Sequence, residues 1–256
     1  MEDDFFQAHY LKEEKAESLD ALGANDLKWK CLGAACRSSC CFFAYSRISL
    51  HEIVPLSKYF PVIFCAVVPE GGEREIAVCI LRRVVKDNNY CTYLKKGEGC
   101  VLKEERPLSC KQYPFSVDTD QSGSTRVLVR QGCPGFSEDS GHSLVMPGNS
   151  RISSYVEREC IRPAISRHAA REETNRFVGA VTRHDLIAPG QYAYRGESIP
   201  FNLVDAKKLY GLPGDVLDGF RANGYMELVH AHMNSLVANC TRLIDVYLER
   251  KTADCL

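Results

Sequence analysis

The stretch Cys31-Leu-Gly-Ala-Ala-Cys36-Arg-Ser-Ser-Cys40-Cys41 places four cysteines within eleven residues. Four more thiols follow at wider intervals, at Cys91, Cys100, Cys110 and Cys133. Adjacent cysteines such as Cys40 and Cys41 seldom form a disulfide with each other, because that bond needs a wider Cα separation than one peptide gives. In a chain without an export signal, thiols grouped in this way are predicted to be metal ligands.

The composition is that of a globular protein. The 256 residues are 45% hydrophobic, which is enough for one large domain or two modest ones. The 32 basic and 33 acidic residues nearly cancel, so the chain lacks the basic excess of a nucleic-acid-binding protein. We therefore expect no nucleic-acid partner.

The N-terminal sequence predicts a cytoplasmic location. It begins with the acidic segment Met-Glu-Asp-Asp and contains no apolar core of a secretory signal. No run of eighteen apolar residues occurs, so no membrane-spanning helix and no membrane partner are expected. Thiols stay reduced in the cytoplasm, which is consistent with metal coordination.

The remaining pattern predicts helices at both ends and strands between them. Ser49 and Glu52 form a possible capping box before a predicted helix over 53–64, which Pro55 should bend or shorten. A strand is predicted from Glu75 onward, and residues 114–118 and 125–131 read as a hairpin. Apolar residues at helical spacing predict a helix over 224–250.

These elements indicate an α+β fold: a small antiparallel β-rich cysteine-cluster metal module with N-terminal and C-terminal helical parts. The expected domains are a helical lead-in at 1–30, the metal-binding module at 31–136 and a helical region at 150–256. A loop rich in Pro, Gly and Ser at 134–150 separates the last two.

Several of the grouped cysteines lie in turns that suit metal ligands. Cys100 follows Gly99, Cys110 follows Pro107, and Cys133 precedes a Pro-Gly pair. Nearby cations, among them Arg106 and Lys111, could offset the charge of several thiolates. The predicted metal ligands are Cys31, Cys36, Cys40, Cys41, Cys91, Cys100, Cys110 and Cys133.

Sites made of cysteine alone select zinc or iron–sulfur centres. Eight thiols exceed one tetrahedral zinc but suit a four-cysteine cluster with extra thiols nearby, or two centres. We therefore expect an iron–sulfur cluster of the four-iron four-sulfur type, with zinc as the alternative cofactor.

The cysteine order is also similar to that of a known family. The four thiols of 31–41, the later Cys91 and Cys100, the segment Arg106-Pro107-x-x-Cys110-Lys111-x-Tyr113-Pro114-Phe115 and the final Cys133-Pro134-Gly135 together resemble the CxxCxxCC family of zinc- or iron-chelating proteins. The resemblance covers 31–136, although the first two gaps are four and three residues where the family has two and two. One branch, the flagellin lysine-N-methylases, is thought to carry an iron–sulfur cluster.

The other cysteines are predicted to be ordinary buried residues. Cys65 and Cys79 lie in apolar segments, and Cys160 and Cys240 lie on predicted helices, where a thiol packs as a small hydrophobe. His232 lies on the apolar stripe of the last helix and is predicted to be a core residue. No GxGxxG, P-loop, GxSxG or HExxH motif occurs, so catalytic residues and enzymatic activity stay open.

Three functions are compatible with these observations. The first is a cytoplasmic cysteine-cluster metalloprotein whose iron–sulfur centre has a redox or protein-modifying role. The second is a zinc-stabilised module that binds another protein. The third, which rests on the resemblance alone, is a lysine N-methyltransferase. All three have another protein as partner, and the oligomeric state is left open.

Overall fold

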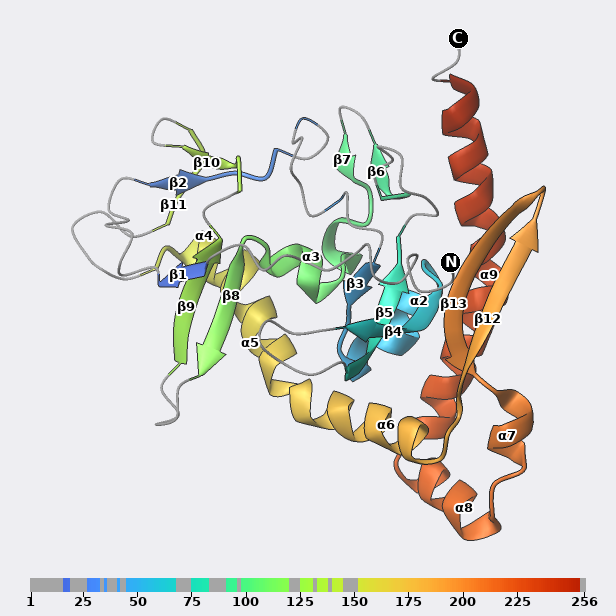
Figure 1. Ribbon diagram of the computed structural model, residues 1–256. Coiled ribbons are helices and arrows are strands. Elements are labelled where there is room, and N and C mark those ends of the chain that lie inside the picture. The colour runs from blue at the N-terminus through green and yellow to red at the C-terminus, as the bar shows by residue number, and fades with distance from the viewer. Residues whose placement is uncertain are drawn as a thin grey trace. The chain divides into compact units, whose positions relative to one another are not determined.

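The computed structural model in Figure 1 forms two compact units. Unit 1 is built from the described residues within 43–92 and 170–256, and unit 2 from those within 11–42 and 93–169. The structure describes residues 16–18, 27–32, 35, 41, 45–67, 75–82, 91–95, 98–119, 125–130, 133–137, 140–144 and 152–253.

Unit 1 contains a five-stranded antiparallel sheet in the order β12-β13-β4-β5-β3. The strands are β3 (Tyr45–Arg47), β4 (Val62–Val67), β5 (Glu75–Leu81), β12 (Ile187–Tyr194) and β13 (Glu197–Val204). The central strands β4 and β5 are nearly continuous runs of apolar residues, as expected for strands that are covered on both faces. In their register, Ile63 lies opposite Cys79 and Cys65 opposite Ala77.

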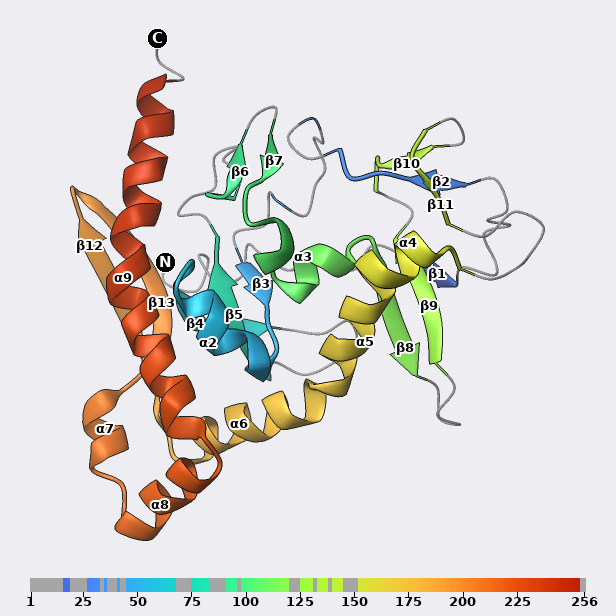
Figure 2. The same ribbon diagram turned by 180° about the vertical axis from the view of Figure 1, so that it is seen from behind.

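Helices cover both faces of this sheet. The unit 1 helices are η4 (Leu50–Glu52), α2 (Ile53–Ser57), α6 (Arg171–Arg183), α7 (Ala206–Tyr210), α8 (Gly214–Ala222) and α9 (Tyr225–Ala253). The long helix α9 runs beside the β12–β13 hairpin (Figures 1 and 2) and packs Leu236, Cys240 and Leu243 onto one face of the sheet. Phe177 of α6 lies against Phe64, with 6.2 Å between ring centroids. Because alternate residues of β4 point to opposite faces, the sheet forms two apolar layers.

Side chains of α9 bind the backbone where β4 and β13 meet. The only paired residues between these strands are Asn202 and Phe64 among the described residues. The Val62 amide donates to Ser235 Oγ at 2.7 Å, and His232 Nδ1 donates to the Val62 carbonyl at 2.7 Å. The Val204 amide donates to His232 Nε2 at 3.1 Å. The histidine and serine therefore replace ladder hydrogen bonds that the two strands do not make with each other.

The β12–β13 hairpin turns at Arg195 and Gly196, which have φ values of 49° and 80°. A two-residue turn with positive φ at both positions matches the twist of antiparallel strands. The register then places Pro189 opposite Asn202 and Ile187 opposite Val204.

Unit 2 consists of short strands and helices around its own core. The strands are β1 (Ala16–Ser18), β2 (Lys28–Trp29), β6 (Leu94–Lys95), β7 (Gly99–Cys100), β8 (Phe115–Thr119), β9 (Thr125–Arg130), β10 (Phe136–Ser137) and β11 (His142–Ser143). The helices are η5 (Lys103–Glu105), α3 (Leu108–Gln112), α4 (Ser154–Val156), the π-helical η6 (Glu157–Ile161) and α5 (Arg162–Ala169). The core gathers Trp29, Phe115, Val129, Cys133, Leu144, Val156, Cys160 and Ile161.

Two glycines allow the chain to pass close to β2. A Cβ atom at Gly135 would lie 2.4 Å from the Lys30 carbonyl oxygen, and one at Gly141 would lie 2.8 Å from the Trp29 carbonyl group. Gly141 also has a φ of 116°, which side chains rarely adopt. Both positions therefore require glycine if β10 and β11 are to pair with β2.

The structure confirms several predicted elements and corrects others. The α+β class, the capping box of Ser49 and Glu52, the hairpin β8–β9 and the long final helix are confirmed. The predicted helix over 53–64 is wrong beyond Ser57, because the chain turns at Phe60-Pro61 and enters β4. The β12–β13 hairpin was not predicted. The expected domain bounds 1–30, 31–136 and 150–256 stay predictions, and residues 1–15 lie outside the described part of the chain.

None of the helices in the described part of the chain has the length and apolar character that crossing a bilayer requires.

Candidate functional site

One group of reactive side chains in unit 2 is drawn from four separate segments. It consists of Cys31 after β2, Arg106 after η5, His142 on β11, Tyr155 on α4 and Cys160 on η6. We refer to these five residues as the thiol site. Their mutual influence is visible in the ring contact of His142 with Tyr155 and in the charges that shift the pKa values of Tyr155 and Cys160.

The pairing of β2 with β11 positions the histidine of this site. His142 lies directly opposite Trp29, and opposite residues of an antiparallel pair share a face. Trp29 packs edge-on against Phe115, with 5.7 Å between ring centroids. His142 stacks on the ring of Tyr155 at 3.5 Å and an interplanar angle of 17°. The exposed histidine and the tyrosine therefore form one aromatic pair beside the unit 2 core.

The tyrosine and the second cysteine lie on one helical stretch that widens at its centre. Ser153 caps the start of α4, where its hydroxyl accepts from the Val156 amide and donates to the Ser143 carbonyl. The turn that carries Cys160 is π-helical. Pro163 follows it and has no N–H to donate to the preceding turn, which accounts for the local widening. π-Helical turns of this kind occur frequently at functional sites.

Cys160 is the buried thiol of the site. It has no exposed surface and packs in the core that contains Trp29 and Cys133. Burial raises its pKa to about 12, and the Glu159 carboxylate and Cys31 add to this rise, while Arg106 opposes it. Cys160 is therefore a protonated thiol at neutral pH.

Tyr155 is affected by the same charges. Its pKa is raised first by burial, then by Cys160 and Glu159, and Cys31 adds a smaller contribution. Arg106 again acts in the opposite direction. Cys31, Cys160 and Arg106 therefore all act electrostatically on one tyrosine.

Arg106 is held by its own backbone turn. Its Nε donates to the Lys103 carbonyl at 2.8 Å, and the following Pro107 begins α3. Its charge also lowers the pKa of Cys100, a thiol whose pKa is raised by burial and by Cys41. One guanidinium group therefore acts on thiols from two different parts of unit 2.

The two thiols of the site differ in access to solvent. Cys31 is exposed, whereas Cys160 is fully buried. An exposed thiol can attack an electrophile or a disulfide as its thiolate, and a buried neighbour can react only after the first bond has formed. This arrangement suits stepwise thiol chemistry.

The structure distributes the eight predicted metal ligands over different surroundings. Cys31 is exposed; Cys41, Cys100 and Cys110 are half-buried; and Cys91 and Cys133 are buried. Cys41 and Cys100 lie close enough for the charge of one to shift the pKa of the other. Cys133 packs in the apolar core of unit 2, whereas Cys91 belongs to unit 1. Cys36 and Cys40 lie outside the described residues, so the full set stays a prediction.

The predicted metalloprotein function is wrong. Among the residues that the structure describes, no three His, Cys, Asp or Glu side chains are arranged to hold a metal ion. A zinc–thiolate centre needs its sulfur atoms about 2.3 Å from a common point, and the described residues provide no such group. The metal-binding, iron–sulfur and zinc assignments are withdrawn with it. The cofactor itself stays a prediction from the sequence.

Three members of the thiol site, Tyr155, His142 and Cys160, were not predicted as functional residues. Cys160 was assigned to the core, which its burial confirms, but its neighbours Tyr155 and His142 were not considered. The histidine comes from the loop-like segment 134–150, where only its pairing with β2 gives it a fixed position. A sequence pattern for this pairing was present only in Gly135 and Gly141, which allow the strands to approach.

The fold and the site together define a thiol-rich α+β protein with two compact units and, in the described part of the chain, no disulfide. The chain matches the family model described as SapC over residues 26–243, which is well over half of its length. It therefore belongs to the SapC family. The resemblance to the CxxCxxCC family was wrong, because the cysteine order covered a shorter stretch and the metal group that it implied is not present in the described residues. No curated protein and no solved structure matched the chain.

Proposed function

We propose that this SapC family protein binds another protein and exchanges thiol and disulfide with it through Cys31. The observation that carries the proposal is that an exposed thiol, Cys31, and a buried one, Cys160, both raise the pKa of Tyr155, which Arg106 lowers. Chance placement of thirteen cysteines explains buried single thiols well. It explains less well why Cys31 and Cys160, which are more than a hundred residues apart, act on the same tyrosine as Arg106.

The exchange proceeds in two balanced steps. The Cys31 thiolate attacks one sulfur of a disulfide in the partner, forms a mixed disulfide and releases the second partner sulfur as a thiolate, which takes up a proton. Cys160 then loses its proton and attacks Cys31 Sγ, which closes a Cys31–Cys160 disulfide and releases the partner as a dithiol. The chain is oxidised and the partner is reduced.

The raised pKa of Cys160 sets the order of these steps. A thiol with a pKa of about 12 provides little thiolate at neutral pH, so the second step is slow relative to the first. The mixed disulfide with the partner should therefore persist. A long-lived covalent complex is consistent with a protein whose main activity is to bind another protein.

An aromatic disulfide reagent that releases a coloured thiolate tests the reactive thiol. We expect Cys31→Ser to remove the fastest reacting equivalent of the native protein, because Cys31 is the exposed cysteine of the site. Cys110→Ser is the matched control, since Cys110 is half-buried and lies outside the thiol site. An unchanged fast phase in Cys31→Ser would refute the assignment.

The second cysteine and the protein partner need separate measurements. With a disulfide-linked peptide as probe, Cys160→Ala should retain the mixed disulfide on Cys31, while the unsubstituted chain slowly releases the peptide. A protein-binding function also predicts that the peptide reacts at least about tenfold faster than glutathione disulfide, equivalent to about 1.4 kcal/mol of binding. Equal rates for the two probes would leave a reactive thiol without protein recognition and would count against the proposal.

A further inference from the structure

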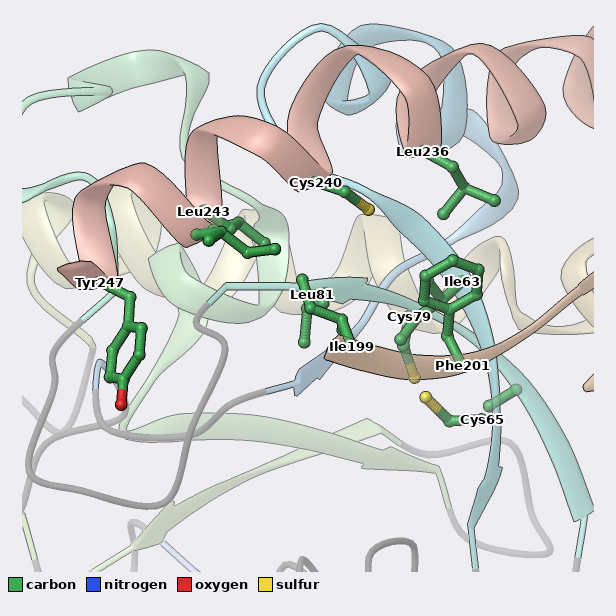
Figure 3. Packing of buried hydrophobic residues seen from close by; sticks show 12 residues of the cluster. Ile63, Cys65, Cys79, Leu81, Ile199, Phe201, Leu236, Cys240, Leu243 and Tyr247 are labelled. Atoms are coloured by element: carbon green, nitrogen blue, oxygen red, sulfur yellow. The ribbon is translucent and has the colours of Figure 1, made fainter. Parts of the chain in front are cut away.

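A second pair of thiols lies in the core of unit 1 and takes no part in the proposed exchange. Cys65 on β4 and Cys79 on β5 are buried, with exposed fractions of 6% and 2%. Both belong to the cluster that α9 packs against (Figure 3). The two residues are diagonal neighbours across the strand pair, because Cys79 lies opposite Ile63 and Cys65 opposite Ala77.

The two thiols face each other directly. Figure 3 shows both sulfur atoms pointing into the space between the strands and toward one another. A hydrogen bond from Cys79 is the largest cause of the raised pKa of Cys65, ahead of burial. Burial raises the pKa of Tyr45 on β3, and both thiols add to this rise. Tyr45 packs against the cluster that contains the pair. The pair therefore occupies one small, closed environment.

We propose that Cys65 and Cys79 form a cross-strand disulfide when a small peroxide reaches the core of unit 1. Diagonal neighbours in a sheet have Cβ atoms somewhat less than about 7–8 Å apart, and a disulfide needs about 3.5–4.5 Å. The strands must therefore move closer locally as the S–S bond of about 2.05 Å forms. Sulfur atoms that already contact each other require the smallest such movement.

The chemistry balances with hydrogen peroxide as the oxidant. The thiolate of one cysteine attacks a peroxide oxygen, which breaks the O–O bond and gives a sulfenic acid and one water molecule. The second thiol then attacks the sulfenic sulfur, which forms the S–S bond and expels a second water. Two thiols lose two protons and two electrons in total, and the peroxide accepts them to give the two water molecules.

Burial makes this a selective site. The two thiols are only 6% and 2% exposed, which hinders a bulky disulfide more than a small peroxide. The raised pKa of Cys65 also lowers its thiolate fraction, so oxidation should accelerate as the pH rises. The pair thus differs in kind from the exposed Cys31, and its behaviour is independent of the proposed exchange.

Trypsin makes the link easy to identify in the unmodified protein. It cuts after Lys58, Arg74 and Arg82, which leaves Cys65 as the only cysteine of peptide 59–74 and Cys79 as the only one of peptide 75–82. The native chain is treated with peroxide, alkylated in acid and denaturant, and digested without reduction. We expect the linked 59–74 and 75–82 peptides to appear, with more product at pH 9 than at pH 7.

Cys240 provides the matched control. It is fully buried in the same cluster, but burial alone raises its pKa to about 12, without the hydrogen bond from a second thiol that acts on Cys65. Cys240→Ser should leave the yield of the linked peptides unchanged. The linkage of either peptide to the one that carries Cys240 should stay far below the Cys65–Cys79 yield.

Two thiols that stay unlinked after peroxide treatment of the folded chain would overturn the proposal. If Cys65 and Cys79 are recovered as alkylated thiols after Cys31 has been fully oxidised, or if the link appears only in denaturant, the pair is inert packing. Because the unsubstituted chain carries the test, the outcome does not depend on whether a Cys65 or Cys79 variant folds.

Discussion

At the scale of single residues, His232 shows how one buried side chain can set the response to pH. It is 1% exposed, and its two ring nitrogens bind the backbones of two different strands. Burial lowers its pKa to about 4, although its hydrogen bond to the Val62 carbonyl opposes this shift. The neutral ring is required, since Nε2 must accept a hydrogen bond from the Val204 amide.

We predict that unit 1 loses stability as the pH falls from about 6.5 to about 4. Over this range the unfolded chain binds a proton at His232 and the folded chain does not, so the free energy of unfolding rises with pH. A shift from 6.5 to about 4 corresponds to about 3 kcal/mol, fully present above pH 6.5. Urea unfolding at several pH values measures it.

The control for this prediction lies on the same helix. His230 is exposed and bonds to the Tyr210 hydroxyl at 2.9 Å, so His230→Gln should keep the pH dependence. His232→Gln should flatten it and lower stability at neutral pH. A dependence that survives unchanged in His232→Gln would show that other groups cause it.

At the scale of elements, the fold of unit 2 depends on very short strands that approach one another closely. β2, β10 and β11 contain two residues each, so little ladder energy holds them. The contact of Gly135 with Lys30, and of Gly141 with Trp29, decides whether these strands can pair. Elements this short are positioned by close backbone contact more than by intrinsic strand propensity.

We predict opposite effects of two glycine-to-alanine substitutions. Gly135→Ala should destabilise unit 2 by about 1–3 kcal/mol, the typical cost of overpacking, because its Cβ would lie 2.4 Å from a backbone oxygen. Gly219→Ala lies within α8 with nothing within 4 Å, and should stabilise the chain by about 0.5–1 kcal/mol. Thermal unfolding of both variants measures the difference. A neutral Gly135→Ala would mean that β10 does not approach β2 in this way.

At the scale of the whole molecule, each unit has its own hydrophobic core. The cluster under α9 contains only unit 1 residues, and the cluster around Trp29 contains only unit 2 residues. A separate core is the main requirement for a part of a chain to unfold as a unit. The single tryptophan of the sequence, Trp29, lies in unit 2, whereas the longest helix lies in unit 1.

We therefore predict two separable unfolding transitions. Ile244→Ala removes a fully buried side chain of unit 1 and should cost about 2–5 kcal/mol, seen in circular dichroism but not in tryptophan fluorescence. Leu144→Ala, at an equally buried position in unit 2, should shift the fluorescence transition instead. If either substitution moves both transitions equally, the units unfold as one.

The sequence predicted those features that depend on local patterns. The helix over 224–250 was recognised because its apolar residues recur at helical spacing, and the β8–β9 hairpin because a polar turn separates two apolar runs. The run from Ile53 to Phe64 was assigned entirely to a helix, since an apolar run alone does not separate a buried strand from a buried helix. The Phe60-Pro61 break was the available signal.

The candidate site was less predictable for a physical reason. The spacing of cysteines shows that thiols are numerous, but it does not show which of them meet in space. Cys133 has the turn context of a ligand, and the fold packs it in the core that contains Trp29. Cys160 has the context of a core residue, and it also acts on the pKa of Tyr155 together with Cys31, which comes from a distant segment.

The hairpin register has a consequence for how copies of the chain behave in concentrated solution. The Val204 amide donates to His232, so the backbone groups of Val204 point away from its partner Ile187. Hydrogen-bonded and non-hydrogen-bonded pairs alternate along antiparallel strands. The pair of Pro189 and Asn202, two residues further on, is therefore of the same non-hydrogen-bonded kind. The nitrogen of Pro189 therefore faces the open side of β12, where an ordinary residue would present a donor. An incoming strand finds no hydrogen-bond donor at that point, and this hinders growth of the sheet into fibrils.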